Sequence, residues 1–584
     1  MAIYYIDNVR GNDSNSGLTK DLAWKNPSKI YTELNNGAGM GTLAAGDSFL
    51  FEAQSVWNLT SNIVFGGSTN KMNGTVGSRI TFDRYDYSTV TTSKPIFTLE
   101  FTPVSSDWTR DTGTIDSVSI DLWYCVPPSF ALGSIPRVTV NNTLCEVTYH
   151  TYTGFHRGVL PSTDNQVMSQ ESPSGKLYIW TPVGVNPEDY YGVGAIKYSP
   201  SVSTHAIFRF YHCGSYITMQ NLEARNAPML ASVWRDDFST DPCTNFIFQN
   251  NRTQDTASAF VTLCNPTNHA NGIVNLEIKD NEIVDAAGYG MQVGYVYTGI
   301  TISGNTINGA SLAKTDGGGV YAAGPALFDS TGLVIEDNYF TRCNYNSLAG
   351  SIDGSAIYLE IRTSGAIVRR NTIYLCPQAL QDNSGCSNLW YSNLIINCDK
   401  VLTVTDASNY ASTSPTGMNI KFYNNTAINT TLDAIYLPFG TVRYNTRFGI
   451  ITLMDSTTAA AGFYTADFRN NIIHGIGTSI TSGDGVRIDT KWNTNINFKN
   501  NSIYGTQDVY SNGSGTLLGT PATTITSDPK VRADGAVSLG SPCIKAGIAT
   551  GLTLTDFENN LFGITPTVGA FEFNAFRDIE GFFE

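Results

Sequence analysis

Charged residues are scarce in this chain of 584 residues: they make up 15% of it, against about 25% in an average globular domain. Most of the charges are acidic, with 50 Asp and Glu against 35 Lys and Arg, so the basic surface that attracts nucleic acid or anionic membranes is missing. No apolar run approaches the roughly 18 residues of a membrane-spanning helix. We therefore expect neither a nucleic-acid partner nor membrane insertion.

Targeting signals and cofactor motifs are missing as well. The opening MAIYYIDNVRG has no basic stretch followed by an apolar one, which predicts synthesis in the cytoplasm without a signal peptide. The six His show no HExxH spacing, and no nucleotide-binding or hydrolase motif occupies a strand-to-helix context. We expect no catalytic metal and no cofactor, and calcium is the one ion left open. The ten Cys form no CxxC pair, which favours buried free thiols.

A short motif, apolar-x-apolar-x-x-Asn-x-apolar, recurs along the chain, for example as LEIKDNEI, ITISGNTI and INFKNNSI. Its asparagines follow one another at intervals of 22 to 46 residues, within the range of roughly 20 to 50 that is typical of stacked repeats. Apolar and polar residues alternate around them, and Ile, Val, Phe and Thr are frequent, which predicts strands rather than helices. The ten motif asparagines are Asn221, Asn251, Asn281, Asn305, Asn338, Asn371, Asn393, Asn425, Asn471 and Asn501.

A constant Asn corner joined by loops of variable length predicts a parallel β-helix, an all-β solenoid in which each coil adds one strand to each sheet. Asn tolerates the left-handed conformation that a corner needs, and stacked Asn side chains can bond to one another between coils. The motif is absent from the early part of the chain. We predict residues 1–95 as the N-terminal cap and first coils, 96–200 as a small β-rich insert, 201–515 as the parallel β-helix and 516–584 as a closing segment.

Both ends of the chain resemble right-handed parallel β-helix carbohydrate-active proteins. The run YYIDNVRGNDSNSGLTKDLAWKNPSKIY, followed by LAAGDSFLFEAQSVW, is similar to the entry segment of that family, and SLGSPCIKAG with VGAFEF is similar to its closing segment. Among such proteins the chain looks most like a bacteriophage tailspike that depolymerises capsular or O-antigen polysaccharide. The resemblance implies a right-handed coil, a bacterial surface polysaccharide as partner, a homotrimer, and action outside the cell on a virion tail.

Three aspartates are candidates for the chemistry, because each lies four residues before an apolar residue of a predicted strand: Asp285 before Tyr289, Asp316 before Val320 and Asp353 before Ile357. Hydrolysis of a glycosidic bond needs two carboxyl groups flanking it, about 5 to 9.5 Å apart. We predict Asp316 and Asp353 as this pair, with Glu360 as the first replacement. Asp316 and Asp353 also begin Asp-Gly turns, so a purely structural role stays open for each of them.

Aromatic and basic side chains near these aspartates are expected to contact the sugar chain. Trp234 belongs to the stretch WRDD, which we predict as a polar loop. The predicted substrate-binding residues are Tyr321, Tyr358, Arg362, Trp390 and Trp234.

Three functions remain open at this point. Paired carboxylates favour an endo-acting glycoside hydrolase. A polysaccharide lyase needs a base and a group that neutralises the uronate carboxylate, and Lys314, Arg342, Tyr345 and Arg362 would supply candidates. A glycan-binding adhesin without catalysis is the third possibility.

Overall fold

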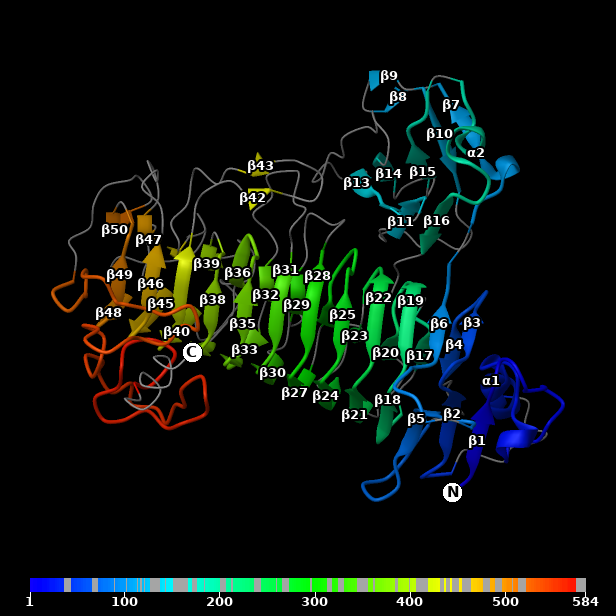
Figure 1. Ribbon diagram of the computed structural model, residues 1–584, viewed down its shortest axis with the longest axis horizontal. Coiled ribbons are helices and arrows are strands. Elements are labelled where there is room, and N and C mark those ends of the chain that lie inside the picture. The colour runs from blue at the N-terminus through cyan, green and yellow to red at the C-terminus, as the bar shows by residue number, and fades with distance from the viewer. Residues whose placement is uncertain are drawn as a thin grey trace. The chain divides into compact units, whose positions relative to one another are not determined.

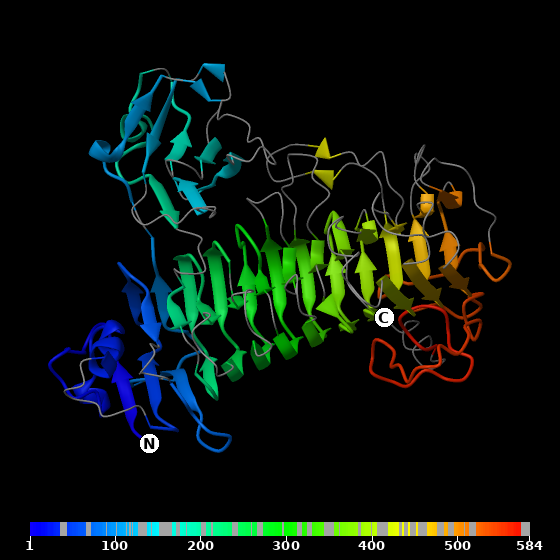
Figure 2. The ribbon, with the colours of Figure 1, turned by 180° about the vertical axis from the view of Figure 1, so that it is seen from behind.

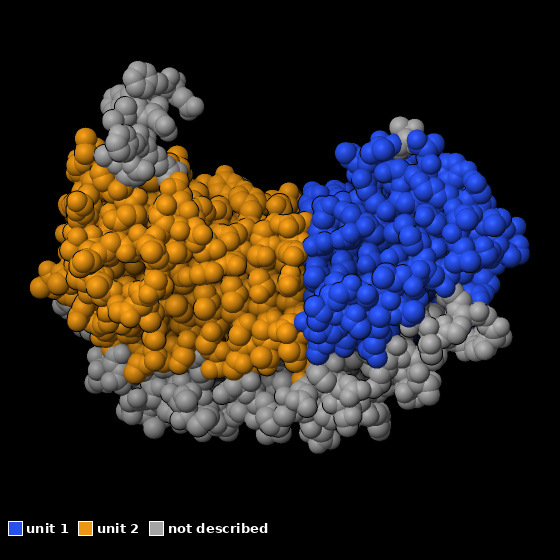
Figure 3. All heavy atoms as spheres, turned by 90° about the horizontal axis from the view of Figure 1, so that it is seen from below, with its two compact units in different colours: residues 1–263, 282–292, 310–316 blue, residues 264–281, 293–309, 317–584 orange. Residues whose placement is uncertain are grey.

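A computed structural model describes the chain apart from a set of loops and the last residues. The gaps in the described ranges are residues 36–43, 66–71, 89, 101, 113, 116–117, 120, 127–136, 142, 151–165, 171–175, 183, 200–205, 212–213, 236–242, 259, 265–271, 295–296, 312–317, 324–329, 344–354, 361–362, 384–386, 399, 406–417, 431–434, 437–441, 444–450, 454–463, 476–483, 489–495, 507, 513–520 and 574–584. Two compact units account for the chain: residues 1–263, 282–292 and 310–316, and residues 264–281, 293–309 and 317–584 (Figure 3).

Three long parallel sheets build the second unit, and their strands lie side by side in Figures 1 and 2. Sheet A has the order β24 (Ile273–Lys279), β27 (Tyr297–Ser303), β30 (Ser330–Glu336), β34 (Ile367–Arg369), β37 (Leu389–Tyr391), β40 (Met418–Tyr423), β45 (Tyr464–Arg469) and β48 (Ile496–Lys499). Sheet B has the order β28 (Thr306–Ala310), β31 (Tyr339–Cys343), β35 (Thr372–Tyr374), β38 (Leu394–Ile396), β41 (Thr426–Thr430), β46 (Ile472–Gly475) and β49 (Ser502–Tyr504). Sheet C has the order β29 (Gly318–Ala323), β32 (Ser355–Glu360), β36 (Gln378–Asn383), β39 (Lys400–Thr405), β44 (Ile451–Leu453), β47 (Asp484–Ile488) and β50 (Asp508–Asn512). Each coil contributes one strand to each sheet, so the predicted parallel β-helix is confirmed.

The core of this unit consists of rows of apolar side chains that stack from coil to coil. Because strands pair in parallel and in register, equivalent residues of successive coils lie about 4.8 Å apart. One such row of sheet C contains Val320, Ile357, Leu380, Leu402 and Ile451, all of them buried. The residues between them point to the opposite face of the sheet, away from the core.

The motif asparagines form a continuous buried ladder between sheets A and B. In each step the Oδ1 atom of one Asn accepts from the backbone N and from the Nδ2 atom of the Asn one coil earlier, at 2.8 to 3.2 Å. The predicted bonding between stacked asparagines is therefore confirmed. The eight ladder residues of this unit are Asn281, Asn305, Asn338, Asn371, Asn393, Asn425, Asn471 and Asn501.

We expected the motif Asn itself to adopt the left-handed conformation. In the structure, the residue before each ladder Asn adopts it instead. Asp280, Arg370 and Asn470, for example, have φ of 55°, 53° and 58°. Asn221 is such a preceding residue, with φ of 60°, and Leu222 occupies the ladder position itself, where its backbone N donates to Asn251 Oδ1. The assignment of Asn221 to the ladder was thus wrong by one residue.

The first unit contains the same kind of winding, with its parallel strands in three sets, together with the helix α1 (Ser28–Asn35). The strand orders are β1 (Ile3–Ile6), β2 (Ser48–Glu52), β5 (Ile80–Tyr85), β18 (Ile217–Gln220) and β21 (Cys243–Gln249); β3 (Val56–Asn58), β6 (Ile96–Thr98), β19 (Glu223–Ala227), β22 (Arg252–Thr256) and β25 (Glu282–Val284); and β4 (Ile63–Phe65), β17 (Phe208–Tyr211), β20 (Ala231–Arg235) and β23 (Phe260–Cys264). Phenylalanine rings fill its core, and Phe82 and Phe208 lie 5.8 Å apart between ring centroids.

Residues 96–200, the predicted insert, include the two-stranded sheet of β8 (Thr114–Ile115) and β9 (Val118–Ser119) and two larger sheets with a core of buried residues. Their orders are β13 (Glu146–His150), β14 (Gln166–Gln170), β15 (Lys176–Ile179), β10 (Leu122–Cys125) and β7 (Thr109–Asp111), and β12 (Thr143–Leu144), β11 (Arg137–Val140) and β16 (Ile196–Ser199). Trp108, Val138 and Ile179 are buried in this core, and Trp123 and Tyr191 pack against it. The helix α2 (Pro187–Tyr191) supplies Tyr191. No helix in the described ranges is long and apolar enough to cross a membrane.

The cysteines agree with the prediction of buried thiols at six positions and contradict it at one. The buried cysteines that form no disulfide are Cys125, Cys145, Cys343, Cys376, Cys398 and Cys543. Burial raises the pKa of the Cys376 thiol well above its usual range, which keeps the thiol protonated. Cys243 instead takes part in a disulfide, so the expectation of a free thiol was wrong for this residue.

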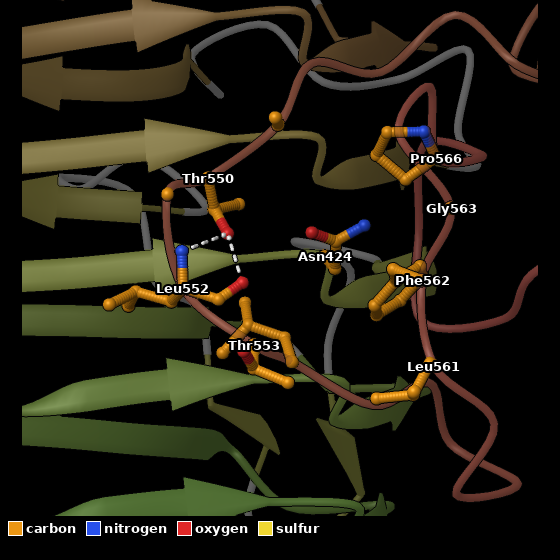
Figure 4. A pocket seen from close by; sticks show the side chains of 11 residues that line it. Asn424, Thr550, Leu552, Thr553, Leu561, Phe562, Gly563 and Pro566 are labelled. Carbon is orange, nitrogen blue, oxygen red and sulfur yellow. Dashed lines mark hydrogen bonds between the residues drawn. The ribbon is translucent and has the colours of Figure 1, made fainter.

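The described part of the closing segment, residues 521–573, packs along the Asn corners of the last coils. Asn470 binds it twice, since Nδ2 donates to the Ile548 carbonyl at 2.8 Å and Oδ1 accepts from the Ile548 backbone N at 2.9 Å. Asn424 donates to the carbonyls of Thr567 and Gly569. A cavity of about 340 Å³ opens between the loops of this segment; Figure 4 shows it lined by Asn424, Thr550, Leu552, Thr553, Leu561, Phe562, Gly563 and Pro566.

Asn470→Gly is expected to loosen the closing segment without disturbing the corner. Gly accepts the left-handed backbone at this position, so the substitution removes the two bonds to Ile548 and a longer bond from Asn470 Nδ2 to Asn424 Oδ1, at 3.4 Å. Limited proteolysis should then cut residues 547–566 several times faster than in the parent protein. Asn397→Gly is the matched control, because Asn397 has φ of 53° and makes no side-chain bond to the described closing segment. Equal cleavage rates in both variants would contradict this account of the segment.

Candidate active site on sheet C

The outward face of sheet C carries two rows of side chains over four successive coils, all of them polar except Ala323. Tyr321, Tyr358, Gln381 and Thr403 form the first row, because each pairs in register with the next. Two residues further along the same strands, Ala323, Glu360, Asn383 and Thr405 form the second row. Neighbours within a row are about 4.8 Å apart and the rows are about 6.6 Å apart, so the eight side chains form one grid.

Glu360 is the carboxylate of this grid, and donors converge on it. Tyr321 donates its phenolic OH to Oε2, and Tyr358 donates to Oε1 at 3.2 Å. Asn383 Nδ2 donates to Oε1 at 3.4 Å and to the Tyr358 phenol at 3.1 Å. Donors directed at a carboxylate favour its ionised form. Glu360 and Tyr321 remain partly exposed, so this charge is within reach of a ligand.

The close approach of the strands that carry this cluster depends on glycine. A Cβ atom at Gly318, where β29 begins, would collide with the Ser355 carbonyl of β32. Gly318 lets the two strands pair closely enough for the rings of Tyr321 and Tyr358 to meet at 5.3 Å, edge to face. In the same pairing Val320 lies beside Ile357 on the core side of these two strands.

The structure thus brings together three of the predicted site residues: Glu360, Tyr321 and Tyr358. Three further residues share their face and were not among the predicted ones: Gln381, Asn383 and Thr403. These three are nearly completely buried, at 1%, 8% and 1% exposed, although they point away from the core rows. Their positions in QALQDN and KVLTVT, where polar residues alternate with Leu and Val, were the available signal.

Trp390, predicted to line a sugar subsite, lies in the core instead, and that prediction was wrong. It belongs to β37 of sheet A and is 0% exposed. Its Nε1 atom donates to Asp382 Oδ2 at 3.2 Å, and Asn388 donates to the same oxygen at 2.9 Å. Asp382 occupies a core row of sheet C, between Leu359 and Val404. These bonds satisfy a buried carboxylate directly beneath the grid and hold β36 against sheet A.

The other predicted residues lie elsewhere or outside the described residues. Asp285 follows β25 directly and has φ of 52°, which makes it a turn residue of the first unit. Trp234 was expected in a loop, but its backbone belongs to strand β20; its side chain lies outside the described atoms. Asp316, Asp353 and Arg362 also lie outside the described residues, so their roles remain predictions.

The chemistry that the described grid offers is that of a carboxylate, two phenols, two amides and hydroxyl groups. Within the described ranges no group of three or more His, Cys, Asp or Glu side chains is arranged to hold a metal ion. Such a surface can accept and donate hydrogen bonds to hydroxyl groups and can present one negative charge to a developing positive charge.

Comparison with known proteins shows the fold. No protein-family model matches the chain, and no curated protein sequence matches it. The chain is similar to XylC, solved in complex with xylose, with 13% identity and a TM-score of 0.56, and the match covers 98% of each chain. This likeness supports a shared parallel β-helix.

Weaker similarities extend to pectate lyase Pel9A and to the GH136 lacto-N-biosidase from Eubacterium ramulus. Pel9A is 13% identical with a TM-score of 0.44, covering 98% of this chain and 97% of that one. The lacto-N-biosidase is 12% identical with a TM-score of 0.44, covering 88% of this chain and 68% of that one. Likeness at this level carries no argument about the reaction.

Proposed function

We propose that the protein is an endo-acting depolymerase that hydrolyses glycosidic bonds of a bacterial surface polysaccharide. The observation that carries the proposal is the Glu360 carboxylate, held by Tyr321 and Tyr358 on the outward face of a parallel β-helix. A long sheet face suits an extended polymer, because successive coils offer the same contacts to successive sugar units. The fold shared with XylC, a protein solved with bound xylose, supports a saccharide ligand.

In this proposal Glu360 acts in its ionised form, as nucleophile or as the base that activates water. The two phenols and the Asn383 amide orient the carboxylate and stabilise its charge. A second carboxyl group must protonate the leaving oxygen, and Asp316 and Asp353 are the residues we propose for that step. Cleavage then yields a new reducing end and a non-reducing hydroxyl, with the elements of water added across the bond.

A polysaccharide lyase is the second candidate, and the phenols of Tyr321 and Tyr358 favour it, since a tyrosine can carry the proton in an elimination. Of the cations considered for charge neutralisation, Arg342 lies in β31 of sheet B, where its Nε donates to Asn308 at 2.8 Å. Lys314, Tyr345 and Arg362 lie outside the described residues.

Incubation with a panel of capsular and O-antigen polysaccharides tests the proposal. We expect oligosaccharide products with new reducing ends and with masses that include one added water per cleavage. Products that absorb near 235 nm without added water would identify a lyase. Unchanged polymer length with every member of the panel, together with retained binding, would identify an adhesin.

Attachment to a virion tail, action outside the host cell and assembly as a homotrimer are further parts of the proposal, supported by the resemblance of the chain to bacteriophage tailspikes. Light scattering of the purified protein should give three times the chain mass of 63.3 kDa. Loss of activity in EDTA would show that the reaction needs calcium, the one ion left open.

A further inference from the structure

Two polar atoms of the grid are buried without a hydrogen-bond partner in the described part of the chain. They are Asn383 Oδ1 and Thr403 Oγ1. Buried polar groups are nearly always paired, because an unpaired one loses its contacts with water and gains nothing in return. Both residues point away from the core rows, toward the face on which Glu360 lies. An unpaired acceptor and an unpaired hydroxyl on the same face as an oriented carboxylate indicate a place for a ligand.

The positions of these two atoms relative to Glu360 indicate how long a ligand must be to contact all three groups. Asn383 is the neighbour of Glu360 in the second row, and Thr403 lies one coil further in the first row. Adjacent coils are about 4.8 Å apart and the rows about 6.6 Å apart, so Asn383 lies directly beside Glu360, while Thr403 lies roughly 12 Å from Glu360 along the sheet, within the span of two adjacent sugar units. Gln381, which lies between Tyr358 and Thr403, adds an amide to the same surface.

The chemistry of these groups selects the kind of sugar. A hydroxyl group both donates and accepts, so it can donate to Asn383 Oδ1 and can also pair with Thr403 Oγ1. A uronate carboxylate only accepts, and beside Asn383 Oδ1 and the charged Glu360 it would meet an acceptor and a like charge. We propose that Asn383, Thr403 and Gln381 form a subsite for the hydroxyl groups of neutral sugar units next to the Glu360 carboxylate. This inference rests on the proposed function, of which it names the substrate class.

Thr403→Val is the sharpest test, because it removes the hydroxyl and keeps the shape of the side chain. We expect the affinity for a neutral oligosaccharide to fall about five- to tenfold, the usual effect of one lost hydrogen bond. The ligand-free variant should unfold at the same or a higher temperature, since an unpaired polar atom has been removed from a buried position. A structural role of Thr403 would instead lower the unfolding temperature and leave the affinity unchanged.

Thr253→Val is the matched control. Thr253 also carries a buried Oγ1 without a partner in the described part of the chain, but it lies in β22 of the first unit. It should show the same effect on unfolding and no effect on binding. Asn383→Leu, which removes the amide beside Glu360, should weaken binding more than Thr403→Val.

Binding of the neutral probes is measured by calorimetry in a Glu360→Gln background, so that turnover does not consume the ligand, and binding of the uronate probes is measured in the protein that keeps the Glu360 charge. The probes are hexasaccharides of neutral hexose or pentose units and, in parallel, hexasaccharides of uronic acid units. Binding of a neutral probe that weakens in Thr403→Val and Asn383→Leu supports the subsite. Binding only of uronate probes, no binding of either class, or affinities unchanged by both substitutions would overturn it.

The outcome is separable from that of the proposed function. If a neutral probe binds as expected and the parent protein cleaves no polysaccharide, the subsite stands and the depolymerase proposal fails. If the parent protein cleaves a polysaccharide, and the KM for that polysaccharide is unchanged in Thr403→Val and in Asn383→Leu, the depolymerase proposal stands and the subsite fails.

Discussion

Glu360→Gln is expected to lower the rate of polysaccharide cleavage about a thousandfold, because it removes the only charge that the described grid presents to the reacting bond. Gln keeps the shape of the side chain; its amide oxygen can accept from one of the two phenols and its NH2 group can donate to the oxygen of the other, so the thermal unfolding temperature should change little. The rate is measured as reducing ends released per enzyme and unit time, on the polysaccharide that the parent protein cleaves best.

Glu277→Gln is the control for the loss of one negative charge. Glu277 lies on β24, half exposed, and its carboxylate pairs with Lys279 at 2.8 Å. Its substitution should leave cleavage unchanged. Full activity of Glu360→Gln would remove Glu360 from the reaction and leave Asp316 and Asp353 as the remaining predicted pair, for which Asp→Asn substitutions apply the same test.

Asn371→Ala should destabilise the β-helix by about 3 to 5 kcal/mol, at the upper end for a single substitution. Asn371 is fully buried, and its Oδ1 accepts from the backbone N and Nδ2 of Asn338 at 3.1 and 3.0 Å. Its Nδ2 donates to the Ile335 carbonyl and to Asn393 Oδ1. Alanine leaves these groups buried and unpaired in two neighbouring coils. The shift in the urea unfolding midpoint measures the loss.

Asn371→Asp separates the hydrogen bonds from packing, since Asp has nearly the same volume but cannot donate from the position of Nδ2. It should destabilise the protein about as much as Asn371→Ala. Asn419→Ala provides the baseline, because Asn419 is a partly exposed residue of β40 outside the ladder. A loss of less than about 1 kcal/mol in Asn371→Ala would show that the ladder contributes little to stability.

The repeat could be predicted from the sequence because it depends on interactions between residues close together in the chain. Each corner needs a left-handed residue followed by an amide that can bond above and below, and both requirements act within a few residues. The same locality explains the error at Asn221. Asn occurs both at the ladder position and just before it, as in Asn424 and Asn425, and only the pairing between coils tells the two positions apart.

The buried position of Trp390 could have been predicted from the repeat motif. It lies three residues before Asn393, the position that Ile278, Ile302 and Ile335 occupy before their own ladder residues. All three of these isoleucines are buried, as Trp390 is. The periodicity of the motif therefore indicated a core position for Trp390. The prediction of a sugar subsite relied on the indole ring alone and was wrong.

Alternation along the strands and the corner residues determined, from the sequence alone, that this chain winds into stacked parallel coils, because both depend on neighbours a few positions apart. Only the tertiary structure decided that Glu360 meets Tyr321, Tyr358 and Asn383, since these residues come from three different coils joined by loops of unequal length. Their meeting depends on the register between coils, which is set by parallel pairing across the whole sheet and leaves no local trace in the sequence.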